Sequence, residues 1–130
     1  MPALVDAAGP AVAAAPAMTL RLAGGGRFGS QRRPQVAWAG LEGDVEPLVD
    51  LARRLAAVAR SLRLAVEERP FRPHLTLGRW RAGRPADGSI VDLLADYRGP
   101  SWPVTEVALL DSHLGPAPTY ETVAAWTIGR

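Results

Sequence analysis

The sequence contains no cysteine and no lysine, and only two histidines among its 130 residues. Without cysteine the chain has no disulfide, no thiol nucleophile and no cysteine-based zinc site. Without lysine it has neither a P-loop lysine nor a lysine that could form a Schiff base. All 15 basic residues are arginines, and biased codon usage is the simplest account of most of them. The net charge of +2 is too small to indicate nucleic-acid binding by itself.

Long apolar segments are also absent. The longest uncharged run near the N-terminus spans residues 7–20, and glycine and proline interrupt it, so it is too short to cross a membrane. The first residues lack a basic region and include Asp6, which argues against a secretory signal. We therefore expect a cytoplasmic protein. The hydrophobic content of 48% and charged content of 22% predict one globular domain over residues 1–130.

Hydrophobic periodicity predicts an α+β fold with a mainly antiparallel sheet. Residues 45–62 place apolar side chains on one stripe, which indicates an amphipathic helix that covers one face of the sheet. Alternating patterns predict strands, of which the last two should pair antiparallel. These strands span residues 17–22, 35–41, 104–110 and 120–128, with a further short strand around His74.

Three other segments are expected to be short or irregular. Residues 1–15 predict a short helix or a loose arm, because Gly9 and Pro10 should end a helix. Residues 80–88 predict a loop. Ser89 should begin a short helix, with Asp92 completing a capping box.

Gly24, Gly26 and Gly29 match the G-x-G-x-x-G dinucleotide fingerprint by letter. That fingerprint needs a helix directly after it, and residues 30–34 lack a helical period. A glycine-rich turn between two strands is the better interpretation. Phe28 would lie in this turn, where it could pack on the core or stack on a nucleobase; core packing is the commoner role.

One histidine lies in the segment Arg-Pro-Phe-Arg-Pro-His-Leu-Thr-Leu-Gly-Arg, residues 69–79. Along a strand, His74 and Thr76 point to one face, while Leu75 and Leu77 point to the other and should face a core. An imidazole that exchanges protons near neutral pH beside a small hydroxyl donor suits chemistry on a phosphate. A bare His-x-Thr is nevertheless a weak signal, and a histidine on a strand is more often structural.

The longer pattern resembles the second signature of the 2H phosphoesterases, and most closely that of the RNA 2',3'-cyclic phosphodiesterases, also called the 2'-5' RNA ligase family. Every fixed position of Arg-Pro-Phe-x-Pro-His-x-Thr-Leu-x-Arg is present. Weaker resemblances to the middle strands and the last hairpin of the family extend the match to about residues 16–128. The segments that carry them are residues 26–29, 34–40 and 112–115, with Tyr120.

The resemblance implies a bilobal fold in which two histidines act on a 2',3'-cyclic phosphate of RNA without metal or cofactor. Hydrolysis gives a 2'-phosphate, and the reverse reaction joins RNA ends through a 2'-5' bond. By this resemblance His74 is one acid–base residue and Thr76 and Arg79 bind the phosphate, with Arg72 as a further candidate. Strict alternation places Arg79 on the face opposite His74, so it would have to act from beyond the end of the strand.

The first His-x-Thr motif of the family is missing, because the other histidine, His113, is followed by Leu-Gly. We therefore expect an N-terminally shortened chain whose exposed apolar surface favours self-association. Three sources could supply the second proton-transfer group: His113, a second copy of the chain, or an upstream segment. The alternative is a catalytically incomplete module that binds RNA or nucleotides with the remaining half of the site, or a scaffold.

Overall fold

The computed structural model describes residues 2–81 and 88–129, and the chain divides into two compact units. The helix–hairpin unit contains Met1–Met18, Glu46–Phe71 and Pro103–Arg130. The sheet unit contains Thr19–Val45 and Arg72–Trp102. A single domain over residues 1–130 stays a prediction, and the expected loop at residues 80–88 lies mostly outside the described residues.

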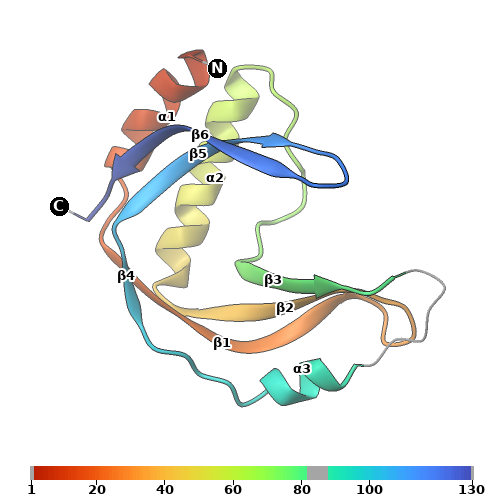
Figure 1. Ribbon diagram of the computed structural model, residues 1–130. Coiled ribbons are helices and arrows are strands. Elements are labelled where there is room, and N and C mark those ends of the chain that lie inside the picture. Colours follow the sequence, from red (N-terminus) through yellow and green to blue (C-terminus); the bar gives the residue numbers. More distant parts are fainter. Residues whose placement is uncertain (1, 82–87, 130) are drawn as a thin grey trace. The chain divides into compact units, whose positions relative to one another are not determined.

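The helix–hairpin unit packs two helices against a β-hairpin (Figure 1). Its elements are α1 (Pro2–Ala13), α2 (Val45–Ser61), β5 (Glu106–His113) and β6 (Thr119–Thr127). The core is formed by the buried side chains Val12, Met18, Leu51 and Ile128. The predicted amphipathic helix matches α2, and the predicted antiparallel pairing of the last two strands matches β5 and β6.

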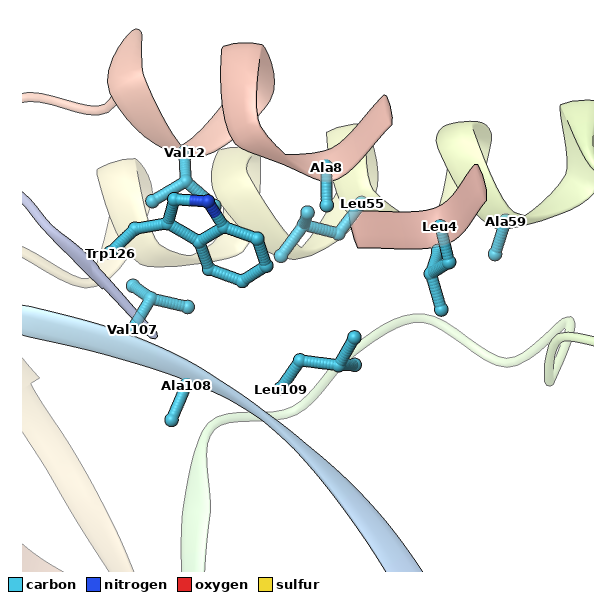
Figure 2. Close-up of a pocket in the computed structure, with 9 residues that line it drawn as sticks. All are labelled: Leu4, Ala8, Val12, Leu55, Ala59, Val107, Ala108, Leu109 and Trp126. Carbon is cyan, nitrogen blue, oxygen red and sulfur yellow. The ribbon is translucent and has the colours of Figure 1, made fainter. Parts of the chain in front are cut away.

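An apolar cavity of about 200 Å³ lies inside this unit (Figure 2). Leu4, Ala8 and Val12 of α1 and Leu55 and Ala59 of α2 line it together with residues of the hairpin, among them Trp126. Trp126 also packs against the buried core, whereas Trp102 is 40% exposed and is not a core residue.

The helix α1 continues through Gly9 and Pro10, so the expectation that these residues end it is wrong. Proline in a helix interior removes one backbone hydrogen bond. The surrounding packing offsets this loss, because Ala8 and Val12 on the same helix are buried. The carbonyl of Pro10 still accepts a hydrogen bond from the backbone N–H of Ala14, which continues the helical pattern. The N-terminal segment is therefore a packed helix and no loose arm.

The sheet unit is built on antiparallel strands with the order β3-β2-β1-β4 (Figure 1). The strands are β1 (Met18–Gly29), β2 (Pro34–Gly43), β3 (His74–Arg79) and β4 (Trp102–Val104), of which β4 contributes only Trp102 to this unit. The short helix α3 (Ser89–Leu94) packs on one face, because a methyl group on Gly25 would lie 2.7 Å from Leu94. The predicted α+β class with antiparallel sheet is thus confirmed.

The glycine-rich segment is part of β1, and the prediction of a turn there is wrong. Gly25 and Gly26 pair with Ala39 and Trp38 of β2, and the turn comes only after Gly29, which has a φ of +95°. Glycine is accommodated in this strand because α3 approaches one face and an indole ring the other.

Two smaller expectations are also wrong. The short helix α3 begins at Ser89 as predicted, but Gly88 is its N-cap and no side chain caps that helix end, so the Ser89–Asp92 capping box does not form. Leu75 and Leu77 are 48% and 45% exposed, because β3 is an edge strand of the described sheet and its leucines are only partly covered. Within the described ranges, none of the helices has the length and apolar character needed to cross a membrane.

Candidate active site

The strand pairing of the sheet unit gathers several of the predicted site residues on one face. Thr76 of β3 pairs with Trp38 of β2, and Trp38 pairs with Gly26 of β1. His74, two residues before Thr76, pairs with Gly40. Paired residues, and residues two apart on one strand, share a face of the sheet. His74, Thr76 and Trp38 therefore lie on the same face, opposite the face that α3 covers.

A β-bulge adds Arg79 to this face. Trp38 of β2 pairs with Thr76 of β3. Val36 lies two residues before Trp38 on the same face of β2, but it pairs with Arg79, which lies three residues after Thr76 on β3. One additional residue on β3 shifts its alternation by one position. The expectation that Arg79 points away from His74 is therefore wrong. The bulge brings an arginine to the same surface as the imidazole and the hydroxyl.

The imidazole of His74 is oriented by a backbone hydrogen bond. Its Nδ1 lies in hydrogen-bond contact with the carbonyl oxygen of Arg72. A carbonyl only accepts, so Nδ1 carries the proton and Nε2 is the nitrogen left to exchange protons with a ligand. Arg72 thus contributes its backbone to the site. Its exposed side chain remains a predicted phosphate ligand.

An aromatic pair supports the imidazole. The ring of Phe28 meets that of His74 edge-on, with centroids 4.9 Å apart, and lies 5.6 Å from that of Trp38. Trp38 lies 6.1 Å from His74. Phe28 belongs to β1 and is half-buried, so its placement in a turn is wrong. Its half-buried position favours packing, and base stacking by Phe28 stays a prediction.

Trp38 is the site residue that sequence reasoning missed. Its indole lies over Gly26, because a methyl group there would lie 2.5 Å from the indole Cζ2. The indole Nε1 is buried, and among the described residues it has no hydrogen-bond partner, so the ring contributes by packing. Gly26 lies opposite Trp38 only because of the register between β1 and β2, and the sequence alone does not predict that register.

Replacing Gly26 with alanine should destabilise the fold by about 1–3 kcal/mol, because the new methyl group overlaps the Trp38 indole. The displaced ring should also disturb the imidazole of His74. Urea unfolding followed by tryptophan fluorescence measures the change. Gly78→Ala is the matched control, because a methyl group at Gly78 meets nothing within 4 Å. Equal stability losses in the two variants would contradict this packing.

His113 belongs to the helix–hairpin unit. Its Nε2 lies 3.8 Å from Asp111 Oδ2 and 3.8 Å from Glu121 Oε2, and all three side chains are exposed. This is the arrangement of a solvated charge cluster on a hairpin. His74 is the only histidine of residues 19–45 and 72–102. Across the residues that the structure describes, no group of three or more histidine, cysteine or carboxylate side chains gathers in a way that could hold a metal.

The arrangement as a whole combines one proton-exchanging nitrogen, one hydroxyl donor and one guanidinium on an open surface. A hydroxyl and a guanidinium both donate hydrogen bonds to phosphate oxygens, and the guanidinium can do so with two N–H groups at once. An imidazole beside such donors can give a proton to, or take one from, an oxygen attached to the same phosphorus. The surface therefore has the parts that phosphoester chemistry requires on one side of the phosphate.

Comparisons with known proteins place the chain in a family. A sequence model of the 2'-5' RNA ligase superfamily matches residues 1–116. The chain is 30% identical over 129 residues to an RNA 2',3'-cyclic phosphodiesterase of Geobacillus stearothermophilus. This match covers 98% of the chain but only 40% of that relative.

Solved structures of similar proteins agree with this match. A protein of Thermus thermophilus, TT0787, superimposes with a TM-score of 0.77 at 27% identity, over 98% of this chain and 69% of that one. LigT of Escherichia coli in complex with 3'-AMP gives a TM-score of 0.73 at 26% identity, over 99% of this chain and 68% of that one. The chain belongs to the 2'-5' RNA ligase superfamily of 2H phosphoesterases.

Proposed function

We propose that the chain acts on RNA ends as a 2',3'-cyclic phosphodiesterase, by metal-independent acid–base catalysis with His74. The observation that carries the proposal is the oriented imidazole of His74, whose Nε2 is left to exchange protons, on the same sheet face as Thr76 and Arg79. The name of the Geobacillus relative supports the reaction type. LigT of Escherichia coli, solved with 3'-AMP and with ATP, supports a surface for phosphorylated adenosines.

The reaction divides into two proton transfers. Water attacks phosphorus, the bond from phosphorus to the 3' oxygen breaks, and the product keeps the phosphate on the 2' oxygen. One group takes the proton of the attacking water, and another gives a proton to the departing 3' oxygen. His74 performs one of these transfers. Thr76 and Arg79 donate hydrogen bonds to the phosphate oxygens, whose negative charge grows in the transition state.

The second proton-transfer group lies outside the sheet unit, if it is a histidine, because His74 is the only histidine in that unit. His113, a second copy of the chain and a further segment of the protein are the candidates. Reversal of the same steps would join an RNA end through a 2'-5' bond. The chain spans 40% of the curated relative that it matches, so the activity of the whole protein is part of the proposal.

A second candidate function rests on the same single histidine. With one proton-transfer group, the surface would bind nucleotides or RNA through the phosphate and turn them over slowly. A missing partner imidazole lowers the rate by about 10²–10⁴-fold. The chain would then be a nucleotide-binding module of a phosphoesterase type.

Incubation of the purified chain with 2',3'-cyclic AMP and a chelator tests the proposal, with products separated by chromatography. We expect 2'-AMP and no 3'-AMP. Absence of turnover together with saturable binding of 2'-AMP would contradict the proposed enzyme and support the nucleotide-binding module. Absence of both turnover and binding would overturn both candidate functions.

A further inference from the structure

Four arginines, one of them Arg79 of the candidate active site, gather at one end of the sheet in the sheet unit. Arg32 and Arg33 form the turn between β1 and β2, and this turn lies at the same end of the sheet as the last residue of β3, Arg79 (Figure 1). Just beyond β3, the backbone N–H of Trp80 donates a hydrogen bond to the carbonyl of Gln35, 3.0 Å away. This bond holds the chain beside β2, and Arg81 is the next residue. The antiparallel register thus places two stretches of chain, far apart in sequence, at one corner.

The turn that carries two of these arginines is a defined structure. The backbone N–H of Arg33 donates to the hydroxyl of Ser30 over 2.9 Å. Gly29 precedes the turn with a φ of +95°, and a methyl group there would lie 2.6 Å from the carbonyl oxygen of Arg33. These constraints fix the backbone from which Arg32 and Arg33 project, and both residues are exposed.

The corner differs from several other basic positions, because its arginines form no ion pair with a described residue. Elsewhere in the chain, Arg53 and Arg54 pair with Asp50, and Arg98 pairs with Glu42. Within residues 2–81 and 88–129, the four arginines of the corner have no carboxylate within ion-pair distance. The group consists of Arg32, Arg33, Arg79 and Arg81, all exposed. Codon bias would account for arginine in place of lysine at these positions, but it does not account for the lack of a described carboxylate beside them.

Among the residues of the sheet unit that the structure describes, the acidic ones lie elsewhere. Glu42 and Asp44 come at the opposite end of β2 from the turn. Asp92 belongs to α3, which packs on the face opposite the candidate active site. Among the described residues, charge is therefore segregated along the sheet, and the basic end is contiguous with the surface that carries His74 and Thr76.

From this segregation we infer that the corner of Arg32, Arg33, Arg79 and Arg81 binds the sugar–phosphate backbone of a single-stranded RNA whose terminal phosphate lies at His74. Pro34 at the turn lies four positions before Trp38, which is beside Thr76, and this spacing is about 13 Å along the strand. A mononucleotide held at His74 ends before the turn, whereas the preceding nucleotides of an RNA continue to it. The inference rests on the proposed function and makes an oligonucleotide, not a mononucleotide, the preferred ligand.

The test uses the full chain and a labelled single-stranded RNA that ends in a 2'-phosphate, with binding measured by fluorescence anisotropy at several salt concentrations. The double variant Arg32→Gln/Arg33→Gln should weaken RNA binding. It should also lower the slope of log K against log salt by about 1.4, since each single-strand phosphate contact contributes about 0.7. Binding of 2'-AMP, which does not reach the turn, should be unchanged.

The matched control is Arg53→Gln/Arg54→Gln, which removes the same charge from two adjacent, exposed positions on α2. We expect this variant to keep the salt slope of the original chain. Equal slopes in the two double variants, with 2'-AMP still bound, would overturn the basic corner and leave the proposed function standing. Failure of the original chain to bind either 2'-AMP or the RNA would overturn the proposed function and the corner together.

Discussion

Replacing His74 with alanine should lower the turnover of 2',3'-cyclic AMP by about 10²–10⁴-fold, because it removes one of the two proton transfers. The effect should appear in kcat, since the imidazole acts on protons that move only as the reaction proceeds. Chromatographic assay of 2'-AMP formation at saturating substrate measures it. The phosphate donors Thr76 and Arg79 remain in this variant, so 2'-AMP should still bind.

His113→Ala is the companion variant. His113 lies between Asp111 and Glu121 on the hairpin, where a charge cluster explains its presence, and we expect unchanged turnover. A loss as large as that of His74→Ala would make His113 the second proton-transfer group and contradict its assignment to the charge cluster. Unchanged turnover in His74→Ala itself would remove His74 from the mechanism.

Replacing Arg79 with glutamine should lower kcat by about 10²–10³-fold, the effect typical of losing one donor to a developing oxyanion. The β-bulge that places Arg79 on the face of His74 and Thr76 is the physical reason for this expectation. Arg79→Lys should recover only part of the activity, because an ammonium cannot make the two-pronged contact of a guanidinium. Steady-state kinetics on 2',3'-cyclic AMP measures both variants.

Arg27→Gln is the control for the loss of charge. Arg27 lies one residue before Phe28 on β1 and pairs with Ala37, so it belongs to the opposite face of the same sheet. Its replacement removes the same charge near the same strands. Equal losses of kcat in Arg27→Gln and Arg79→Gln would mean that net charge, and not the position of a donor, controls the rate.

The sequence predicts only in part which side chains share the sheet face that carries His74. Alternation alone places His74 and Thr76 together, and the surrounding pattern of fixed residues indicates the family. Alternation fails at Arg79, because a β-bulge depends on how two strands fit side by side. Such a fit involves residues that are far apart in sequence, here Val36 and Arg79, and no local pattern encodes it.

The predictions based on glycine and proline were wrong in α1 and in β1 for the same reason. Gly9 and Pro10 have low intrinsic helix propensity, yet α1 continues because Ala8 and Val12 are buried. The glycines of β1 have low strand propensity, yet they pair with β2 because an indole and a helix occupy the space above and below them. In both cases tertiary packing outweighs local preference. The long helix α2 was predictable because its stripe of apolar residues and its buried face agree.

Self-association stays a prediction, and exposed apolar side chains give it a physical basis. Leu114 is 88% exposed and Tyr120 is 65% exposed, both at the tip of the β5–β6 hairpin. Light scattering across a concentration series measures the oligomeric state.

The most direct test of the central claim, that His74, Thr76 and Arg79 form a phosphate-binding half of an active site, is an NMR titration of the His74 imidazole with 2'-AMP. The account predicts a saturable shift of the Nε2 resonance while Nδ1 stays protonated, and loss of this shift in a Thr76→Ala/Arg79→Gln variant. A His74 imidazole that does not respond to 2'-AMP, in a chain that remains folded, would contradict the claim.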